Sequence, residues 1–269
     1  MTAAPPEVVF RPLAGTVDYD ACAELQRATW GQGFAEVVPG VILKISQKVG
    51  GVAAGAFDRE GRMLGFVFGI TGVRRGRLAH WSHMLAVAAE ARDLGLGRSL
   101  KLYQREQLLP LGVEQVLWTY DPLESRNAHL NFNRLGVEVE EYVENMYDEE
   151  SGSELSRGLG TDRFIVVWEI AGERARRALA GDPPDFAPFR AAPAYDALDG
   201  AAPPEAPRVR VAIPSSIQDV KSERPEEAAA WRAGTRRALQ GYLARGYRVA
   251  AFGADPQAAR GWYGLERVD

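Results

Sequence analysis

The residues with the clearest chemical purpose are two glycines between an apolar, strand-like run and an amphipathic, helix-like run. Gly95 and Gly97 lie in the segment 88–98, which also carries Arg92 and Arg98. Glycines at the start of a helix let the backbone turn tightly and direct successive N–H groups at one point, where the helix dipole adds positive potential. The spacing therefore predicts a loop that binds a phosphate group.

The same segment argues against two other phosphate-binding motifs. A dinucleotide fold needs a third glycine in Gly-x-Gly-x-x-Gly, but Leu100 stands at that position, and the chain contains no Walker Gly-Lys-Ser/Thr. Neither a nicotinamide cofactor nor a nucleoside triphosphate is favoured. Because Arg-x-x-Gly-x-Gly alone is a weak pattern, the prediction depends on the strand and the helix that flank it.

Other reactive side chains are scarce. Cys22 is the one cysteine, so neither an internal disulfide nor a thiolate zinc site is expected, and we interpret it as a core residue of a protein from a reducing compartment. Only three histidines occur: His80, His83 and His129. They supply little material for a metal centre, so no metal is expected.

The overall charge excludes a further class of partner. The chain has 32 Lys and Arg against 36 Asp and Glu, a net charge of −4, so nucleic acid is not expected as a partner. The start of the chain lacks the cationic and apolar segments of a signal peptide, and no run approaches the ~18 apolar residues of a membrane span. We expect a cytoplasmic protein that does not enter a membrane.

The order of predicted elements indicates an α/β fold. Apolar runs around a turn at 58–61 predict an antiparallel hairpin, and the succession of a strand at 79–87, a helix at 96–109 and a strand at 114–121 predicts a parallel crossover. The predicted sheet is therefore mixed, mostly antiparallel, with a central parallel pair. Further strands are expected at 8–13, 137–147 and 163–170. Three further helices are expected: one capped by Asp18, one that starts near Pro39, and one at 124–135 that ends before Gly136.

A composition shift divides the chain. Residues 181–207 hold seven of the sixteen prolines, which is typical of a linker or an irregular loop. The expected organisation is a main domain at 1–172, a Pro/Ala-rich linker at 173–207 and a β-α-β-β extension at 208–269. The expected elements of the extension are a strand at 208–214, a helix at 225–245 and strands at 247–253 and 262–268. Whether this tail caps a substrate site or forms a homodimer is left open.

The loop and its surroundings resemble a known family. The acyl-CoA-binding motif of the Gcn5-related N-acetyltransferase (GNAT) superfamily is similar to Val87-x-x-Glu90-x-Arg92-x-x-Gly95-Leu96-Gly97-Arg98-x-Leu100, and the order of elements over 7–170 is similar to that fold. Segments 125–137 and 158–170 resemble a branch of predicted acetyltransferases with a C-terminal extension. The resemblance implies a GNAT fold and a splayed parallel pair of strands. It also implies acetyl-CoA or another acyl-CoA as cosubstrate.

The resemblance also implies which residues hold the acyl-CoA. The pyrophosphate is expected on the amides of Arg92, Asp93, Leu94, Gly95, Leu96, Gly97, Arg98 and Ser99. The pantetheine arm is expected to pair with the backbone of Leu85, Ala86 and Val87, with an amide near Leu85 facing the thioester oxygen. Asn127 is a further candidate for contacting coenzyme A, against a simple role at the helix start.

The resemblance implies direct attack by an amine of a small molecule, with an amino acid as one candidate. The strand before the loop lacks the usual carboxylate base, so His83 is the candidate base, and strand alternation places Trp81, His83 and Leu85 on one face. Phe132 stands where the superfamily usually has a tyrosine acid, which makes Tyr120 the candidate acid, with Tyr142 and Tyr147 as further substitutes. Candidates for the acceptor site are Trp81, Arg126 and Arg163, against packing for Trp81 and surface salt bridges for both arginines.

Three alternatives stay open from the sequence. The donor is succinyl-CoA rather than acetyl-CoA if a cation lies near the acyl end. The acceptor is a protein lysine or N-terminus if an open acidic groove leads to the site. The chain is a non-catalytic acyl-CoA-binding regulatory module if Phe132 and the missing carboxylate mean that catalysis is absent.

Overall fold

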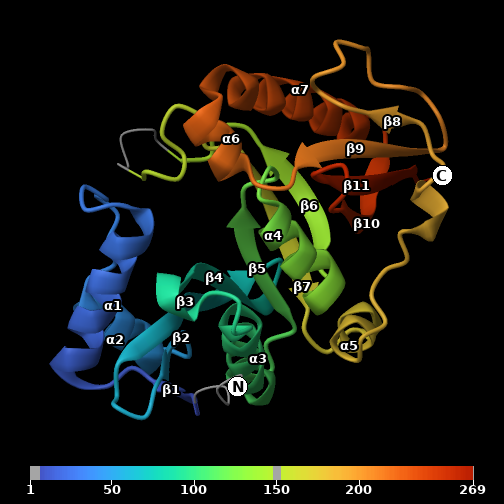
Figure 1. Ribbon diagram of the computed structural model, residues 1–269. Coiled ribbons are helices and arrows are strands. Elements are labelled where there is room, and N and C mark those ends of the chain that lie inside the picture. Colours follow the sequence, from blue (N-terminus) through green and yellow to red (C-terminus); the bar gives the residue numbers. More distant parts are fainter. Residues whose placement is uncertain (1–6, 148–152, 269) are drawn as a thin grey trace, which may run out of the picture. The chain divides into compact units, whose positions relative to one another are not determined.

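A computed structural model describes residues 7–147 and 153–268 (Figure 1). The chain forms two compact units. The first consists of Met1–Trp118 with Glu150–Glu154, and the second of Thr119–Glu149 with Leu155–Asp269. The predicted division into 1–172, 173–207 and 208–269 rests on composition, whereas the two units rest on compactness. The predicted division therefore stays a prediction.

A seven-stranded sheet runs in the order β1-β2-β3-β4-β5-β7-β6. The pairs β1–β2, β2–β3, β3–β4 and β6–β7 are antiparallel, whereas β4 and β5 are parallel. The predicted mixed sheet with a central parallel pair is therefore confirmed. The strands are β1 (Val9–Pro12), β2 (Val52–Phe57), β3 (Met63–Arg74), β4 (Arg77–Val87), β5 (Gln115–Tyr120), β6 (Glu138–Val143) and β7 (Arg163–Glu169).

In the first unit, helices cover both faces of the sheet. Side chains of α1 (Gly15–Trp30) and α2 (Gly40–Lys48) join one core cluster with those of β2, β3 and β4, including Cys22, which is fully buried as predicted. Helix α3 (Leu96–Leu108) lies on the other face. There a Cβ atom at Gly65 of β3 would meet Leu100 of α3.

The start of α1 differs from the prediction that Asp18 is its cap. The helix begins at Gly15, with Ala14 in the capping position. Asp18 lies in the first turn, where its carboxylate accepts a hydrogen bond of 2.7 Å from the Ala14 amide and pairs with Arg11. The carboxylate thus satisfies a free N–H of the helix start from inside the first turn, where negative charge also suits the helix dipole.

Strand β4 contains a β-bulge that sequence alternation does not predict. Met84 pairs with Phe68 of β3, but Ile70, two residues on, pairs with Trp81, so two residues of β4 stand opposite Gly69 alone. The bulge reverses the alternation. Trp81 and His83 therefore lie on the Phe68 face, whereas Leu85, which pairs with Val67, lies on the opposite face. The expectation that all three share a face is wrong for Leu85.

The second unit contains a helix that changes its winding and a second sheet. Helix α4 (Ser125–His129) continues as the π-helical turn η3 (Leu130–Leu135) and ends at Gly136, whose φ of 72° is left-handed as predicted. The second sheet has the order β10-β11-β9-β8. Its strands are β8 (Ala194–Tyr195), β9 (Arg208–Pro214), β10 (Tyr247–Asp255) and β11 (Arg260–Arg267).

The expected β-α-β-β order of the tail is confirmed, with additions. Helix α6 (Ile217–Glu223) precedes the predicted long helix, which is α7 (Pro225–Ala244). The proline-rich stretch is less irregular than expected, because β8 pairs there in parallel with β9, and α5 (Glu173–Leu179) precedes it. Short 3-10 turns are η1 (Ala89–Ala91), η2 (Leu109–Leu111) and η5 (Ala187–Phe189). Over residues 7–147 and 153–268, each helix is too short or too polar to cross a lipid bilayer.

Candidate functional site

The glycine loop joins the end of β4 to the start of α3. After Val87 the chain makes the 3-10 turn η1, and α3 begins at Leu96. Asp93 and Gly95 adopt left-handed backbone conformations, with φ of 70° and 74°. A left-handed residue followed by right-handed ones turns consecutive N–H groups inward, and the first amides of a helix have no intrahelical acceptor. The two left-handed residues place a tight turn at the start of α3, and its binding of an anion stays a prediction.

Burial separates the loop residues into anchors and surface. Leu96 and Leu100 are buried, which fixes the first turn of α3 on the sheet. Arg92, Asp93, Leu94 and Gly95 are exposed, and Gly97, Arg98 and Ser99 are half-buried. The segment that is predicted to bind a phosphate therefore lies at the surface, next to a helix turn that packs on the sheet.

The strand before the loop separates from β5. Parallel pairing joins Ala79–Trp81 to Gln115–Leu117, and within the described residues it ends there, although β4 continues to Val87. Leu85 and Val87 are half-buried and Ala86 lies in the core. The pairing between the two strands thus ends at Trp81, as expected of a splayed pair, and the binding of an extended ligand by 85–87 stays a prediction.

His83 is exposed at the bulge, with its ring 6.1 Å from that of Phe68 in an edge-to-face arrangement. Desolvation by the surrounding protein lowers the pKa of His83, and the negative charge of Glu36 partly opposes this shift. A histidine with a lowered pKa is neutral at pH 7 and can accept a proton. Trp81, two residues earlier, is half-buried on the same face.

Beneath β4 lies a buried polar cluster that sequence reasoning missed. His80 is fully buried, with Nδ1 2.9 Å from Thr71 Oγ1 and Nε2 3.0 Å from Gln104 Nε2. Because Thr71 donates its own proton to the Gly50 carbonyl, we assign the ring proton to Nδ1, so that Nε2 accepts from Gln104. Burial, aided by the Lys101 charge, lowers the pKa of His80 to about 3.

Lys101 of α3 completes this cluster. Its Nζ donates a hydrogen bond of 2.8 Å to Ser82 Oγ and lies 3.7 Å from the centroid of the Trp118 ring. The side chain is buried, and desolvation lowers its pKa well below the ordinary value. A signal was present in the sequence, because Lys101 and Gln104 fall on the same helical stripe as Leu100 and Leu108.

The second unit holds the other predicted site residues: Tyr120, Arg126, Asn127 and Arg163. Tyr120 is buried, and its hydroxyl lies 3.2 Å from that of Tyr263, which donates to the Pro122 carbonyl. Tyr120 therefore donates to Tyr263. Burial raises the pKa of Tyr120 above its ordinary value, which makes it a weak proton donor.

The three polar candidates differ in how firmly they are held. Arg163 donates to the Asp162 carbonyl at 2.8 Å and lies 3.9 Å from Asp121. Its guanidinium carbon is 5.3 Å from the centroid of the Tyr147 ring. Arg126 and Asn127 are exposed on α4. The assignments of all four residues in this unit stay predictions.

An ionic network in the second unit also escaped the sequence analysis. Arg232 of α7 donates a hydrogen bond of 2.5 Å to Asp121, and Arg236 donates two hydrogen bonds of 2.6 and 2.8 Å to Asp162. Asp162 is fully buried and also accepts from Tyr142. Together these bonds lower the pKa of Asp162 although burial opposes them. The network joins α7 to the end of β5 and the start of β7.

Comparisons with known proteins give similar folds at low identity. No family model and no curated protein matches the chain. NAA60 of Arabidopsis thaliana in complex with acetyl-CoA is 14% identical over 61% of this chain and 99% of its own, with a TM-score of 0.48. The ribosomal-protein-S18-alanine N-acetyltransferase of Escherichia coli is 20% identical over 62% and 97%, with a TM-score of 0.46. A phosphinothricin acetyltransferase of Sinorhizobium meliloti in complex with AcCoA is 17% identical over 60% and 86%, also with a TM-score of 0.46.

Proposed function

We propose that this chain is an acyl-CoA-dependent N-acyltransferase of the GNAT superfamily. One observation carries the proposal. The left-handed residues Asp93 and Gly95 lie in a turn that follows a strand whose pairing with its parallel neighbour ends at Trp81, and we propose that this turn binds the anion. In an acyl-CoA, an extended pantetheine arm follows the pyrophosphate. A cluster of amides next to a strand edge suits the two parts of such a molecule.

The proposed chemistry uses main-chain groups for the donor and one side chain for the acceptor. The amides of 92–99 bind the pyrophosphate of acetyl-CoA, and those of 85–87 hold its pantetheine arm, with the amide near Leu85 stabilising the charge that develops on the thioester oxygen. The acceptor amine attacks the carbonyl carbon, the C–S bond breaks, and the thiolate leaves. His83, which is neutral at pH 7, takes the proton that the amine loses.

The thiolate needs little help to leave. A thiol pKa of about 8.5 makes sulfur a fair leaving group, and the candidate acid Tyr120 is buried. Phe132 has no proton to give, and the Tyr120 hydroxyl is engaged with Tyr263. We therefore propose direct attack without an essential side-chain acid.

The acceptor that we propose is the amine of a small molecule, with an amino acid as the first candidate. Trp81, Arg126 and Arg163 are the side chains proposed to contact it, the arginines through a carboxylate. Asn127 is proposed to contact coenzyme A. A cytoplasmic location belongs to the same proposal, and the tail at 208–269 either caps the acceptor site or builds a homodimer.

A donor-by-acceptor screen tests the proposal. Purified full-length protein is mixed with acetyl-CoA, propionyl-CoA or succinyl-CoA and a panel of amino acids, polyamines and peptides, and thiol release is recorded. We expect release above the hydrolysis rate with acetyl-CoA and at least one small amine. Binding of acyl-CoA without release for any pair would favour the regulatory module, which Phe132 supports. A preference for succinyl-CoA or for peptides would favour those alternatives.

A further inference from the structure

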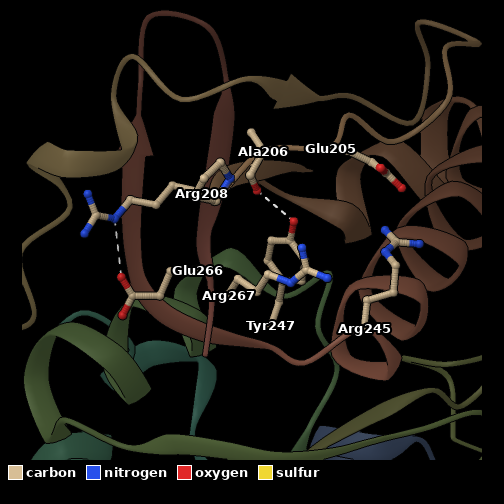
Figure 2. A pocket seen from close by; sticks show the side chains of 8 residues that line it. Glu205, Ala206, Arg208, Arg245, Tyr247, Glu266 and Arg267 are labelled. Carbon is tan, nitrogen blue, oxygen red and sulfur yellow. Dashed lines mark hydrogen bonds and ion pairs between the residues drawn. The ribbon is translucent and has the colours of Figure 1, made fainter. Parts of the chain in front are cut away.

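The proposed reaction does not use a cavity of about 650 Å³ that lies in the second unit (Figure 2). This volume lies within the range of small-molecule sites, roughly 300–1,000 Å³. Three segments distant in the sequence meet there: the stretch that leads into β9, the turn between α7 and β10, and the end of β11. The lining residues are Glu205, Ala206, Pro207, Arg208, Arg245, Tyr247, Glu266 and Arg267.

One wall of this cavity is fixed by hydrogen bonds to backbone carbonyls. The Tyr247 hydroxyl donates to the Ala206 carbonyl at 2.7 Å (Figure 2), and the Tyr242 hydroxyl donates to the Pro204 carbonyl at the same distance. The Arg267 amide donates to the Pro207 carbonyl at 2.9 Å. The stretch 204–207 is therefore tied at three points to the elements beneath it.

Two arginines of the cavity, both exposed, lie near aromatic rings rather than carboxylates. The guanidinium carbon of Arg245 lies 5.0 Å from the centroid of the Tyr242 ring, and that of Arg267 lies 6.0 Å from the centroid of Tyr247. Over residues 7–147 and 153–268, neither guanidinium forms an ion pair. Contact with a ring face leaves the N–H edge of a guanidinium available for a pair of anionic oxygens.

The charge balance of the cavity favours an anion. Glu266 is shared between Arg208, at 3.4 Å, and Arg248, at 2.7 Å, and these bonds lower its pKa. Its charge is thereby neutralised within the wall. Among the remaining charged residues of the lining, Glu205 is negative and Arg245 and Arg267 are positive. The cavity therefore carries an excess of positive charge, although the net charge of the chain is −4.

We propose that this cavity binds a small organic anion through a phosphate or carboxylate group held by Arg245 and Arg267. Both groups present the pair of oxygens that a guanidinium binds with two parallel hydrogen bonds. The Tyr247 ring and the Arg267 stem supply the apolar contact for the rest of the molecule. The site shares no residue with the glycine loop, so it stands independently of the proposed acyl transfer.

Calorimetric titration of the full chain tests this site. Inorganic phosphate, pyrophosphate and succinate are titrated at low salt into the unaltered protein and into an Arg245→Gln/Arg267→Gln double variant. We expect saturable binding of at least one probe and at least tenfold weaker binding in the double variant. Binding that is equal in both proteins, or the lack of saturable binding by every probe, overturns the proposal.

Two controls separate this site from other causes of anion binding. An Arg59→Gln/Arg224→Gln double variant removes the same charge from exposed positions outside the cavity, and it should bind each probe as the unaltered protein does. The same titrations in a Gly95→Trp background remove the loop as a competing site. Loss of binding there, with binding retained by the cavity variant, would place the anion on the loop and refute the cavity site.

Discussion

The amine of Lys101 lies 2.8 Å from Ser82 Oγ and 3.7 Å from the centroid of the Trp118 ring, in the interior of the first unit. The ring face favours the ammonium form, but full desolvation outweighs it, and the pKa of Lys101 falls well below its ordinary value. A buried lysine therefore occupies a position on α3 where an apolar side chain would be expected. The Lys101 amine donates a hydrogen bond to the hydroxyl of Ser82, which lies at the β4 bulge.

Replacing Lys101 with methionine tests this arrangement. Because desolvation lowers the pKa of Lys101 on folding, protonation of this amine favours the unfolded state and reduces the stability of the fold. We expect Lys101→Met to raise the free energy of unfolding at pH 7 by about 1 kcal/mol, net of the lost Ser82 hydrogen bond. The measurement is chemical denaturation.

The pH dependence gives the sign of the Lys101 effect. Because the folded-state pKa is lowered, the stability of the unaltered protein rises with pH up to the unfolded pKa of about 10.4, with a slope of at most about 1.4 kcal/mol per pH unit. The advantage of Lys101→Met should shrink from pH 7 to pH 10. Lys48→Met removes an exposed lysine as a control. An advantage that stays constant with pH would mean that Lys101 is charged in the folded state.

His80 should make the protein sensitive to acid. Its folded-state pKa of about 3 lies below the unfolded value of about 6.5, so its contribution to stability is lost as pH falls through that window. His80→Asn should cost about 1–3 kcal/mol at pH 7, and its deficit should narrow between pH 6.5 and pH 4. Denaturation curves at four pH values measure this. A deficit that widens in acid contradicts the assignment, and exposed His129→Asn is the control.

The glycine loop offers a closely matched pair of variants. Gly95 and Gly76 have φ of 74° and 78°, and a Cβ atom at either would meet no heavy atom within 4 Å. Tryptophan at either position should therefore cost a similar amount of stability, about 1–2 kcal/mol. Only Gly95→Trp should weaken binding of coenzyme A, by tenfold or more in calorimetry, because it covers the amides. Equal affinities in the two variants would place the binding site elsewhere.

His83 and Glu36 make the proposed base testable through a pH profile. With its pKa lowered, His83 should give an acid limb in kcat/KM below pH 6.5 and a plateau above it. We expect His83→Gln to lower kcat by about 100-fold and to abolish the limb. Glu36→Gln should move the limb to lower pH, because Glu36 raises the pKa of His83. A limb that survives in His83→Gln would assign the base to another group.

Tyr120→Phe tests whether an acid is needed. The substitution removes the hydrogen bond to Tyr263 and leaves the bond from Tyr263 to Pro122, so we expect a loss of about 1 kcal/mol in stability. Because burial raises the pKa of Tyr120, thiol release should change by less than threefold. A fall of 100-fold with unchanged binding of acyl-CoA would instead make Tyr120 the acid.

The local sequence is sufficient to predict the loop and the order of the elements. Gly95 and Gly136 take left-handed conformations that a side chain would strain, and the predicted hairpin, crossover and tail strands follow from periodicity within ten or so residues. These features depend on neighbours in the chain. The amide cluster at 92–99 can accordingly be predicted from the spacing of its glycines and the apolar runs on either side.

Tertiary structure alone decided the register, the charge states and the cavity. The β4 bulge depends on how Gly69 meets a neighbouring strand, and it separates Leu85 from Trp81 and His83. Arg232 meets a carboxylate 111 residues away, and the cavity joins segments near 205, 245 and 266. Periodicity indicates which side chains are buried, but only packing determines what each one meets. For His80 and Lys101, those contacts and the exclusion of water set the pKa.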